Sequence, residues 1–189
     1  PGFINFFLSD KYYSDIIIDV LHKGDDYGKS DYGKGKRILV EFVSANPTGP
    51  MHIGNARGGA IGDCLASVMD FAGYEVAREF YVNDAGNQIE KFGLSLDIRY
   101  QQIYKGEDAV ELPEDSYHGE DIKERAQQFA DVYGDEYMDK SEDERRKALV
   151  EFALPKNIEN MKANMAKYRI EYKTWFKESI LHDSGAVKE

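Results

Sequence analysis

Apolar residues recur at intervals of three and four along much of the chain, which is the spacing of amphipathic helices. The segments that carry this pattern are 10–22, 56–72, 88–104, 122–133 and 149–168. In the second segment the spacing predicts a buried face, made of Ile61, Leu65, Val68, Met69 and Ala72. Pro155 interrupts the last segment and predicts a kink or a break, because proline lacks the amide hydrogen that a helix needs. Ser141 is the predicted cap of the polar stretch before that helix.

Three shorter runs are rich in β-branched and aromatic residues, which is typical of strands. They lie at residues 37–43, 75–82 and 171–176. The first two are joined through a loop and a helix, so they form a βαβ unit, with parallel strands and a right-handed crossover. The sequence therefore predicts an α/β fold. Loops are expected at the glycine-rich residues 23–36 and at the acidic stretch 105–119.

Composition limits the classes of protein to consider. The 189 residues are 42% hydrophobic and 31% charged, which is typical of a globular chain of about one domain. No stretch approaches 18 apolar residues and no secretory signal is visible, so we expect no membrane association. The net charge of −11 opposes nucleic-acid binding through this part of the molecule alone. A single cysteine, Cys64, favours a reducing, cytoplasmic setting, and we expect it to be buried as a small apolar side chain.

The loop after the first strand carries the candidate chemistry. It reads SANPTGPMHIGNARGG, residues 44–59, and leads directly into a helix. Ligands of open parallel sheets bind beyond the carboxyl ends of the strands, and a helix N-terminus favours phosphate. His52 and Asn55 add hydrogen-bond donors, while the glycines allow close approach of a ligand or of another backbone. Neither a GxxxxGK[ST] nor a GxGxxG motif is present, and on the residues alone His52 can equally satisfy a turn.

The tetrapeptide HIGN after SANPTGPM resembles the HIGH signature of class I aminoacyl-tRNA synthetases, and VEFVSANPTGPMHIGNARGG resembles its arginyl-tRNA synthetase form. Further segments are similar to that family in the same order: YGKGKRILVEF at 32–42, REFYVNDAGNQI at 78–89, YHGEDI at 117–122 and WFKESILHDSG at 175–185. The second histidine of the signature is Asn55 here, which keeps a hydrogen-bond donor but carries no charge.

The resemblance implies a Rossmann-type catalytic domain that is split by a connective insertion. It divides the chain into the end of an N-terminal domain at 1–9, a helix and linker at 10–36, the first half of the Rossmann domain at 37–104, a helical insertion at 105–168 and the start of the return at 169–189. The KMSKS loop and the anticodon-binding domain of the family are not among these residues, so we expect a piece of a longer enzyme with little activity alone.

The family's reaction is the activation of arginine with ATP, followed by transfer to the arginine tRNA. The resemblance assigns His52 and Asn55 to catalysis, and assigns ATP binding to both of them together with Pro50 and Gly54. We expect Mg²⁺ to arrive with ATP, because no carboxylate cage is visible and no protein metal site is predicted. The tRNA is expected to bind mainly through absent domains, and the parent enzyme to be a cytoplasmic monomer.

The resemblance places arginine beside the strand ends, with a carboxylate at Glu41 for the guanidinium group. The other residues assigned to arginine are Ser44, Ala45, Asn46, Asn55, Asn83, Asp84 and Gln88. From the residues alone, Glu41 can instead face solvent, Asn46 can form a turn before Pro47, and Asp84 can be the N-cap of the next helix. A Glu41 that faces inward requires a cationic partner.

Two other functions stay open at this point. The first is another nucleotidyl transferase with a HIGH signature, either a different class I synthetase or an adenylyltransferase. The second is a binding module without catalysis, derived from a synthetase, which the Asn55 substitution favours.

Overall fold

A three-stranded parallel sheet forms the centre of the computed structural model, which describes residues 2–187. Its strands are β1 (Arg37–Glu41), β2 (Glu75–Val82) and β3 (Thr174–Lys177), in the order β1-β2-β3. Arg37 pairs with Glu75, and Glu79 pairs with Thr174. The α/β fold and the parallel pairing of the first two strands are confirmed. The third strand begins three residues later than predicted, because the chain turns at Arg169 (φ 63°) and buries Ile170 before it reaches the sheet.

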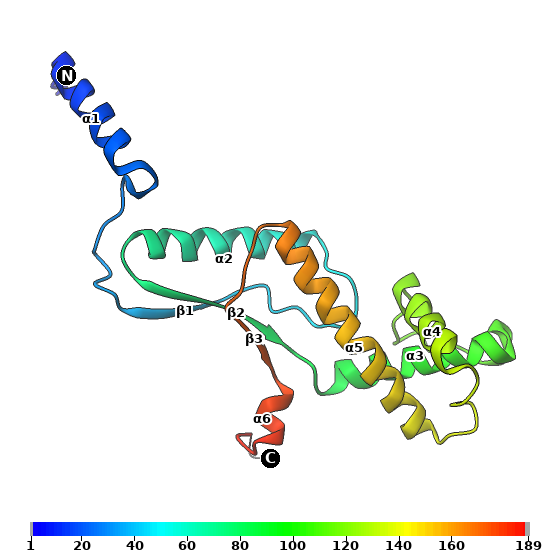
Figure 1. Ribbon diagram of the computed structural model, residues 1–189. Coiled ribbons are helices and arrows are strands. Elements are labelled where there is room, and N and C mark those ends of the chain that lie inside the picture. Colours follow the sequence, from blue (N-terminus) through cyan, green and yellow to red (C-terminus); the bar gives the residue numbers. More distant parts are fainter. Residues whose placement is uncertain (1, 188–189) are drawn as a thin grey trace.

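Helices connect and flank this sheet (Figure 1). Their bounds are α1 Asp10–Lys23, α2 Ile53–Phe71, α3 Asn87–Lys105, α4 Glu120–Tyr133, α5 Glu142–Lys167 and α6 Ser179–Asp183, with short 3₁₀ turns at Gly24–Asp26 and Glu107–Ala109. The first helix has no buried residue and projects away from the sheet (Figure 1). Within residues 2–187, every helix is too short or too polar to traverse a lipid bilayer.

Helix α2 packs on the sheet through a face that the sequence pattern did not predict. Gly59, Gly62 and Ala66 are its buried residues, whereas Ile61 and Val68 are 65% and 66% exposed. A Cβ on Gly62 would lie 2.5 Å from the Cβ of Phe42, and small residues therefore allow the helix to approach the strand end. The predicted apolar face of this helix was wrong, and Cys64, expected to be buried, is exposed as well.

Helix α5 continues through Pro155 without the predicted break. Pro155 and Glu151 are both exposed, so water can bind the Glu151 carbonyl that the proline leaves without a donor. Ser141 is its N-cap, as predicted: the Ser141 hydroxyl accepts from the amide of Glu144 at 3.3 Å. The Glu144 carboxylate accepts in return from the Ser141 amide at 3.2 Å, which completes a capping box.

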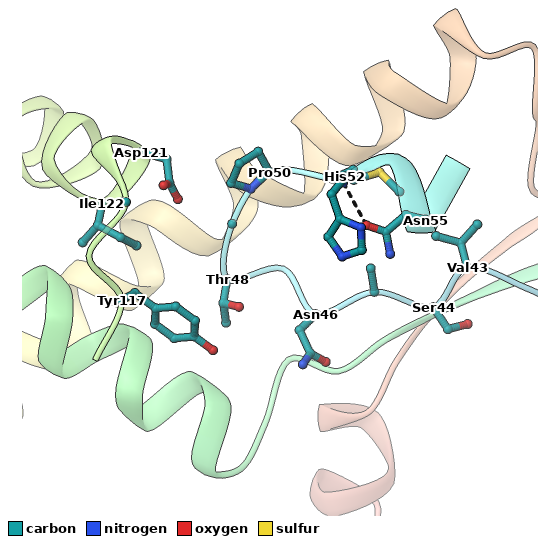
Figure 2. A pocket seen from close by; sticks show the side chains of 14 residues that line it. Val43, Ser44, Asn46, Thr48, Pro50, His52, Asn55, Tyr117, Asp121 and Ile122 are labelled. Carbon is teal, nitrogen blue, oxygen red and sulfur yellow. Dashed lines mark hydrogen bonds between the residues drawn. The ribbon is translucent and has the colours of Figure 1, made fainter. Parts of the chain in front are cut away.

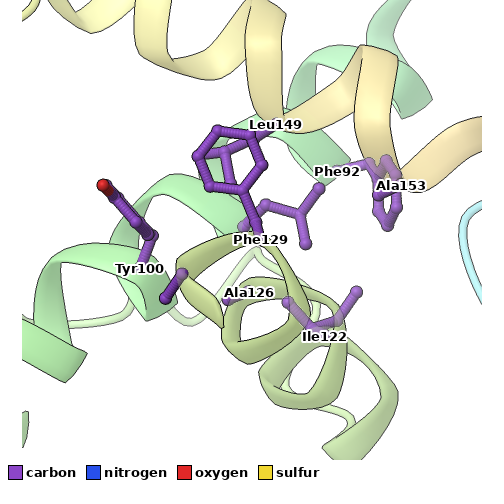
Figure 3. Packing of buried hydrophobic residues seen from close by; sticks show 9 residues of the cluster. Phe92, Tyr100, Ile122, Ala126, Phe129, Leu149 and Ala153 are labelled. Atoms are coloured by element: carbon purple, nitrogen blue, oxygen red, sulfur yellow. The ribbon is translucent and has the colours of Figure 1, made fainter. Parts of the chain in front are cut away.

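Apolar cores lie at both ends of α5. The helical core joins α3, α4 and α5, and Figure 3 shows its side chains, which include Phe92, Leu96, Tyr100, Ile122, Phe129 and Leu149. The sheet core joins β2 to the C-terminal half of α5, through Phe80, Val82, Ile158 and Met161. Helix α3, which the predicted division assigns to the catalytic half, thus packs with the helices of the insertion.

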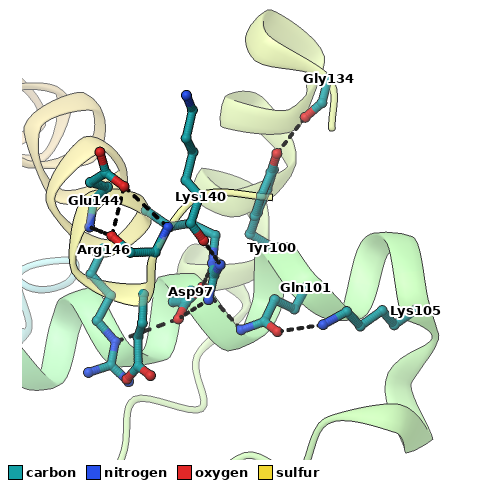
Figure 4. Close-up of polar contacts among 11 residues, drawn as sticks. Asp97, Tyr100, Gln101, Lys105, Gly134, Lys140, Glu144 and Arg146 are labelled. Carbon is teal, nitrogen blue, oxygen red and sulfur yellow. Dashed lines mark hydrogen bonds and ion pairs between the residues drawn. The ribbon is translucent and has the colours of Figure 1, made fainter. Parts of the chain in front are cut away.

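A buried ion pair reinforces the helical core (Figure 4). The Asp97 carboxylate of α3 accepts two hydrogen bonds from the guanidinium group of Arg145 on α5, and Arg146 approaches it at 3.5 Å. The side chain of Asp97 is 2% exposed and that of Arg145 is 10% exposed, so neither charge is solvated. The neighbouring Asp97 raises the pKa of Arg145 further, and this pair therefore holds α3 against α5 in its charged form.

Candidate active site

A cavity of about 510 Å³ lies between the loop after β1 and the start of α4. Figure 2 shows His52 and Asn55 beside each other at the start of α2, Asn46 and Thr48 along the loop, and Tyr117 and Asp121 across from them. The site is thus built by two segments that are far apart in the sequence, one from the sheet and one from the insertion.

His52 and Asn55 form the capping box of α2. The Nδ1 atom of His52 accepts from the amide of Gly54 at 3.1 Å, and the Oδ1 atom of Asn55 accepts from the amide of His52 at 2.9 Å. Since Nδ1 needs its lone pair for this bond, the neutral ring carries its proton on Nε2. One donor from each side chain, His52 Nε2–H and the Asn55 amide nitrogen, is then left for a ligand.

Capping also explains where α2 begins. The helix starts at Ile53, three residues before the predicted start. A Cβ on Gly54 would lie 3.0 Å from the His52 ring, so a side chain there would push the ring by a few tenths of an ångström. The amides of this first turn therefore open toward the same end of the helix as His52, which gives the cavity rim a partial positive charge.

The start of the loop is strained and firmly anchored. Val43 and Ser44 have φ angles of 71° and 45°, and a β-branched residue rarely adopts the left-handed region. This turn directs the Ser44 hydroxyl to donate to Glu41 Oε1 at 2.7 Å and to accept from the Tyr81 amide at 3.1 Å. Ser44 therefore joins the carboxyl ends of β1 and β2.

Carboxylates gather at this end of the sheet. Burial raises the pKa of Tyr81, and the negative charges of Glu178, Asp84 and Glu41 raise it further. Glu41 itself is exposed, and in the described part of the chain its carboxylate contacts the Ser44 hydroxyl without an ion pair. The cationic partner that an inward Glu41 would require is therefore not needed in this arrangement. Three acidic groups around one strand end nevertheless make this region attractive to a cationic ligand.

The residues after β2 bind neighbouring segments of the chain. Asp84 accepts from the amide and the hydroxyl of Ser179, at 2.8 and 2.9 Å. It is not the N-cap of α3, a position that Gly86 occupies, so that prediction was wrong. With its side-chain amide turned so that the nitrogen faces Glu178, Asn83 donates to that carboxylate at 2.6 Å. Gln88 accepts from the hydroxyl of Tyr117.

The structure brings part of the predicted site together. The predicted residues that line the cavity are Ser44, Ala45, Asn46, Pro50, His52 and Asn55. Those that lie outside its lining are Glu41, Gly54, Asn83, Asp84 and Gln88. Sequence reasoning missed Thr48, Tyr117, Asp121 and Ile122 as lining residues. Tyr117, Asp121 and Ile122 belong to the segment YHGEDI, whose resemblance to the family was the only indication of a role. Nothing in its local pattern predicts that it faces a loop 60 or more residues away.

Metal ligands do not cluster in the described part of the chain. Among residues 2–187, no group of three or more His, Cys, Asp or Glu side chains is placed to hold a metal ion.

The parallel sheet, the loop after β1 and the helix that His52 caps form a Rossmann-type α/β arrangement, and the family match places it among the catalytic domains of class I synthetases. Residues 16–168 match the family described as tRNA synthetases class I (R), catalytic domain, and the chain belongs to that family.

Comparisons with individual proteins agree. The chain is 60% identical over 187 residues to an arginine–tRNA ligase of Caldanaerobacter subterraneus, covering 99% of this chain and 33% of that protein. It is 55% identical over 189 residues to the arginine–tRNA ligase of Acetivibrio thermocellus, covering 100% of this chain and 34% of the relative. A Campylobacter jejuni crystal structure, assigned as an arginyl-tRNA synthetase, matches with a TM-score of 0.81 and 34% identity over 93% of this chain and 38% of its own. The chain thus spans about a third of the length of the curated relatives that it matches.

Proposed function

We propose that these residues form part of the ATP and arginine sites of an arginine–tRNA ligase. The observation that carries this function is the start of α2, where His52 and Asn55 leave one donor each at the rim of a cavity of about 510 Å³. The parent enzyme would join the carboxylate of arginine to the α-phosphate of ATP, release pyrophosphate, and then transfer the arginyl group to its tRNA. It would act as a monomer in the cytoplasm.

The ATP side uses the helix start. The Nε2–H group of His52 and the amide nitrogen of Asn55 donate to phosphate oxygens, and the first-turn amides of α2 add partial positive charge. Pro50 and Gly54 shape the backbone that holds these donors. Mg²⁺ would enter with ATP and neutralise phosphate charge, with the phosphates supplying most of its ligands.

The arginine side uses the strand ends. Glu41 supplies a carboxylate to the guanidinium group, and the acidic surroundings that also raise the pKa of Tyr81 favour a cation there. Ser44, Ala45 and Asn46 line the cavity between this region and His52, so they lie where the backbone of the amino acid would pass. The group after β2, which is Asn83, Asp84 and Gln88, supports the same edge of the sheet through bonds to α6 and to the insertion.

The chemistry requires positioning more than a protein nucleophile. The arginine carboxylate attacks the α-phosphorus in line, the bond to the pyrophosphate oxygen breaks, and donors stabilise the charge that develops on the phosphate oxygens. The division into a first Rossmann half at 37–104, an insertion at 105–168 and a return at 169–189 belongs to the same proposal.

Pyrophosphate exchange by the full-length protein tests this function. With arginine, ATP, Mg²⁺ and the arginine tRNA, the wild-type protein should exchange label between pyrophosphate and ATP, whereas glutamine or cysteine should not replace arginine. His52→Ala should lower the rate by about 100-fold, because it removes a donor to a developing charge. Cys64→Ser, at an exposed position further along α2, is the matched control and should retain the rate. A folded wild-type protein without exchange would instead support a binding module.

A further inference from the structure

The signature loop, which is the segment 44–55 that carries the HIGN motif, accepts a hydrogen bond from a side chain of the helical insertion. The Nδ2 atom of Asn157 on α5 donates to the carbonyl oxygen of Pro47 at 2.9 Å, across a sequence separation of 110 residues. Asn157 is 8% exposed and Pro47 is fully buried, so the carbonyl end of this bond is shielded from solvent.

A second residue fixes the orientation of that amide. The Oδ1 atom of Asn157 accepts from Nε of Arg125 on α4 at 2.9 Å. Because a guanidinium group only donates, it turns the amide oxygen toward α4 and the amide nitrogen toward the loop. Gln128 in turn accepts from Nη1 of Arg125 at 2.8 Å and holds the guanidinium group in place.

The loop segment next to Pro47 has space on both of its sides. The cavity of the proposed site lies on one side, and a second cavity of about 300 Å³, lined by Arg125 and Asn157, lies on the other. Gly49, Pro50 and Met51 line both cavities and form the wall between them. Met51 packs against the apolar residues beside the sheet, whereas Gly49 and Pro50 lie between the two cavities, so the position of this part of the wall depends on polar contacts such as the Asn157 bond.

The two ends of the loop are anchored independently. Ser44 is bound to β1 and β2 through Glu41 and the Tyr81 amide, and neither contact involves the insertion. The Asn157 bond comes three residues later, at Pro47, just before the segment that leads to His52. Because Ser44 is bound to the strands, we expect a disturbance at Asn157 to act more on the segment toward His52 than on the segment toward Glu41.

We propose that Asn157, supported by Arg125, is a positioning residue through which the insertion sets the ATP-binding part of the signature loop. This role rests on the proposed function, since it assigns ATP to the His52 side and arginine to the Glu41 side. It makes the affinity for ATP, but not that for arginine, dependent on an amide in the helical insertion.

Asn157→Asp in the full-length protein tests this role, because it keeps the shape of the side chain and replaces the donor with an oxygen that repels the Pro47 carbonyl. We expect the KM for ATP in pyrophosphate exchange to rise about tenfold, while the KM for arginine stays within about twofold. Amide hydrogen exchange should become faster at Thr48, Gly49 and Met51, which is a readout independent of activity. Asn160→Asp is the matched control, with the same chemical change at an exposed position one turn further along α5.

The possible results separate clearly. Wild-type kinetics and wild-type exchange in Asn157→Asp would overturn the role, and so would a parallel rise of both KM values, which indicates general loosening. If Asn157→Asp does not fold, Arg125→Gln replaces it, because it frees the Asn157 amide without a new charge and should give a smaller shift in the same direction. A wild-type protein that does not exchange pyrophosphate contradicts the proposed function, and hydrogen exchange at residues 48–51 then still decides whether Asn157 holds the loop.

Discussion

Replacing Gly62 with alanine should loosen the contact between α2 and the end of β1. The added Cβ would lie 2.5 Å from the Cβ of Phe42, about 1–1.5 Å closer than the ~3.5–4 Å of carbon atoms in contact. Phe42 cannot easily move aside, because it is 8% exposed and packs with Met165, Ile170 and the ring of Tyr172 at 4.7 Å. Overpacking of this kind costs about 3 kcal/mol, and the better helix propensity of alanine returns about 1 kcal/mol.

The net loss of about 2 kcal/mol corresponds to a Tm lower by roughly 4–8 °C for a chain of this length. Gly58→Ala is the matched control, one turn earlier on the same helix, where a Cβ meets nothing within 4 Å. This variant gains helix propensity without a clash, so its Tm should rise by about 2–4 °C. Thermal unfolding of the 189-residue polypeptide, followed by far-ultraviolet circular dichroism, measures both values.

A double-mutant cycle identifies the clash as the cause. Phe42→Ala alone removes a buried ring and destabilises, but in the Gly62→Ala background it also removes the overlaps of the new Cβ with Cγ and Cδ2 of Phe42, leaving only the contact with the Phe42 Cβ. The combined loss in stability should therefore be smaller than the sum of the two single losses by about 1–2 kcal/mol. The packing described for α2 would be refuted if Gly62→Ala melted at or above the temperature of Gly58→Ala, or if the two losses were simply additive.

Three further predictions follow from the polar contacts. Asp97→Asn leaves the guanidinium group of Arg145 buried without its counter-charge, so the free energy of unfolding should fall by about 3–5 kcal/mol in urea titrations. Asn55→Ala removes half of the capping box and should cost about 1 kcal/mol, while Asn55→Asp keeps the acceptor for the His52 amide and should preserve stability in the same titrations. Burial, with a smaller contribution from a nearby carboxylate, raises the pKa of Tyr172 above that of the unfolded chain. Since the unfolded chain loses this proton first, stability should fall as the pH rises above about 10, and Tyr172→Phe should reduce that slope in urea midpoints measured between about pH 9 and 11.

Periodicity in the sequence was sufficient for the order and the type of the main elements. The strand at 75–82 and the helix at 10–22 depend on local preferences, and the structure confirms both within a residue. The face of α2 could not be found in this way, because the pattern counts apolar side chains, whereas the packing of Gly59 and Gly62 depends on side chains that are absent. The same holds for Pro155, whose effect depends on whether the carbonyl of Glu151 can reach water.

For the candidate site, the sequence indicated one wall and not the other. His52, Asn55 and the preceding loop belong to one continuous motif, and the cavity does lie beside them. The wall formed by Tyr117 and Asp121 depends on long-range contacts, such as the hydrogen bonds that Tyr117 makes with Ser95 and Gln88 of α3, which no local pattern encodes. The capping bonds of His52 also depend on the backbone at Gly54, which becomes clear only in three dimensions.

Helix α5 fixes the rotation about its axis of the side chains that enter the helical core relative to those that enter the cores beside the sheet. Leu149 and Ala153 point into the helical core, and Ile158, Met161 and Met165 point into the cores beside the sheet. Deleting one residue between Ala153 and Ile158 would turn one set by about 100° against the other, because an α-helix has 3.6 residues per turn. A change in length should therefore be poorly tolerated in the middle of this helix, where one missing residue would turn the side chains of the helical core out of register with those beside the sheet.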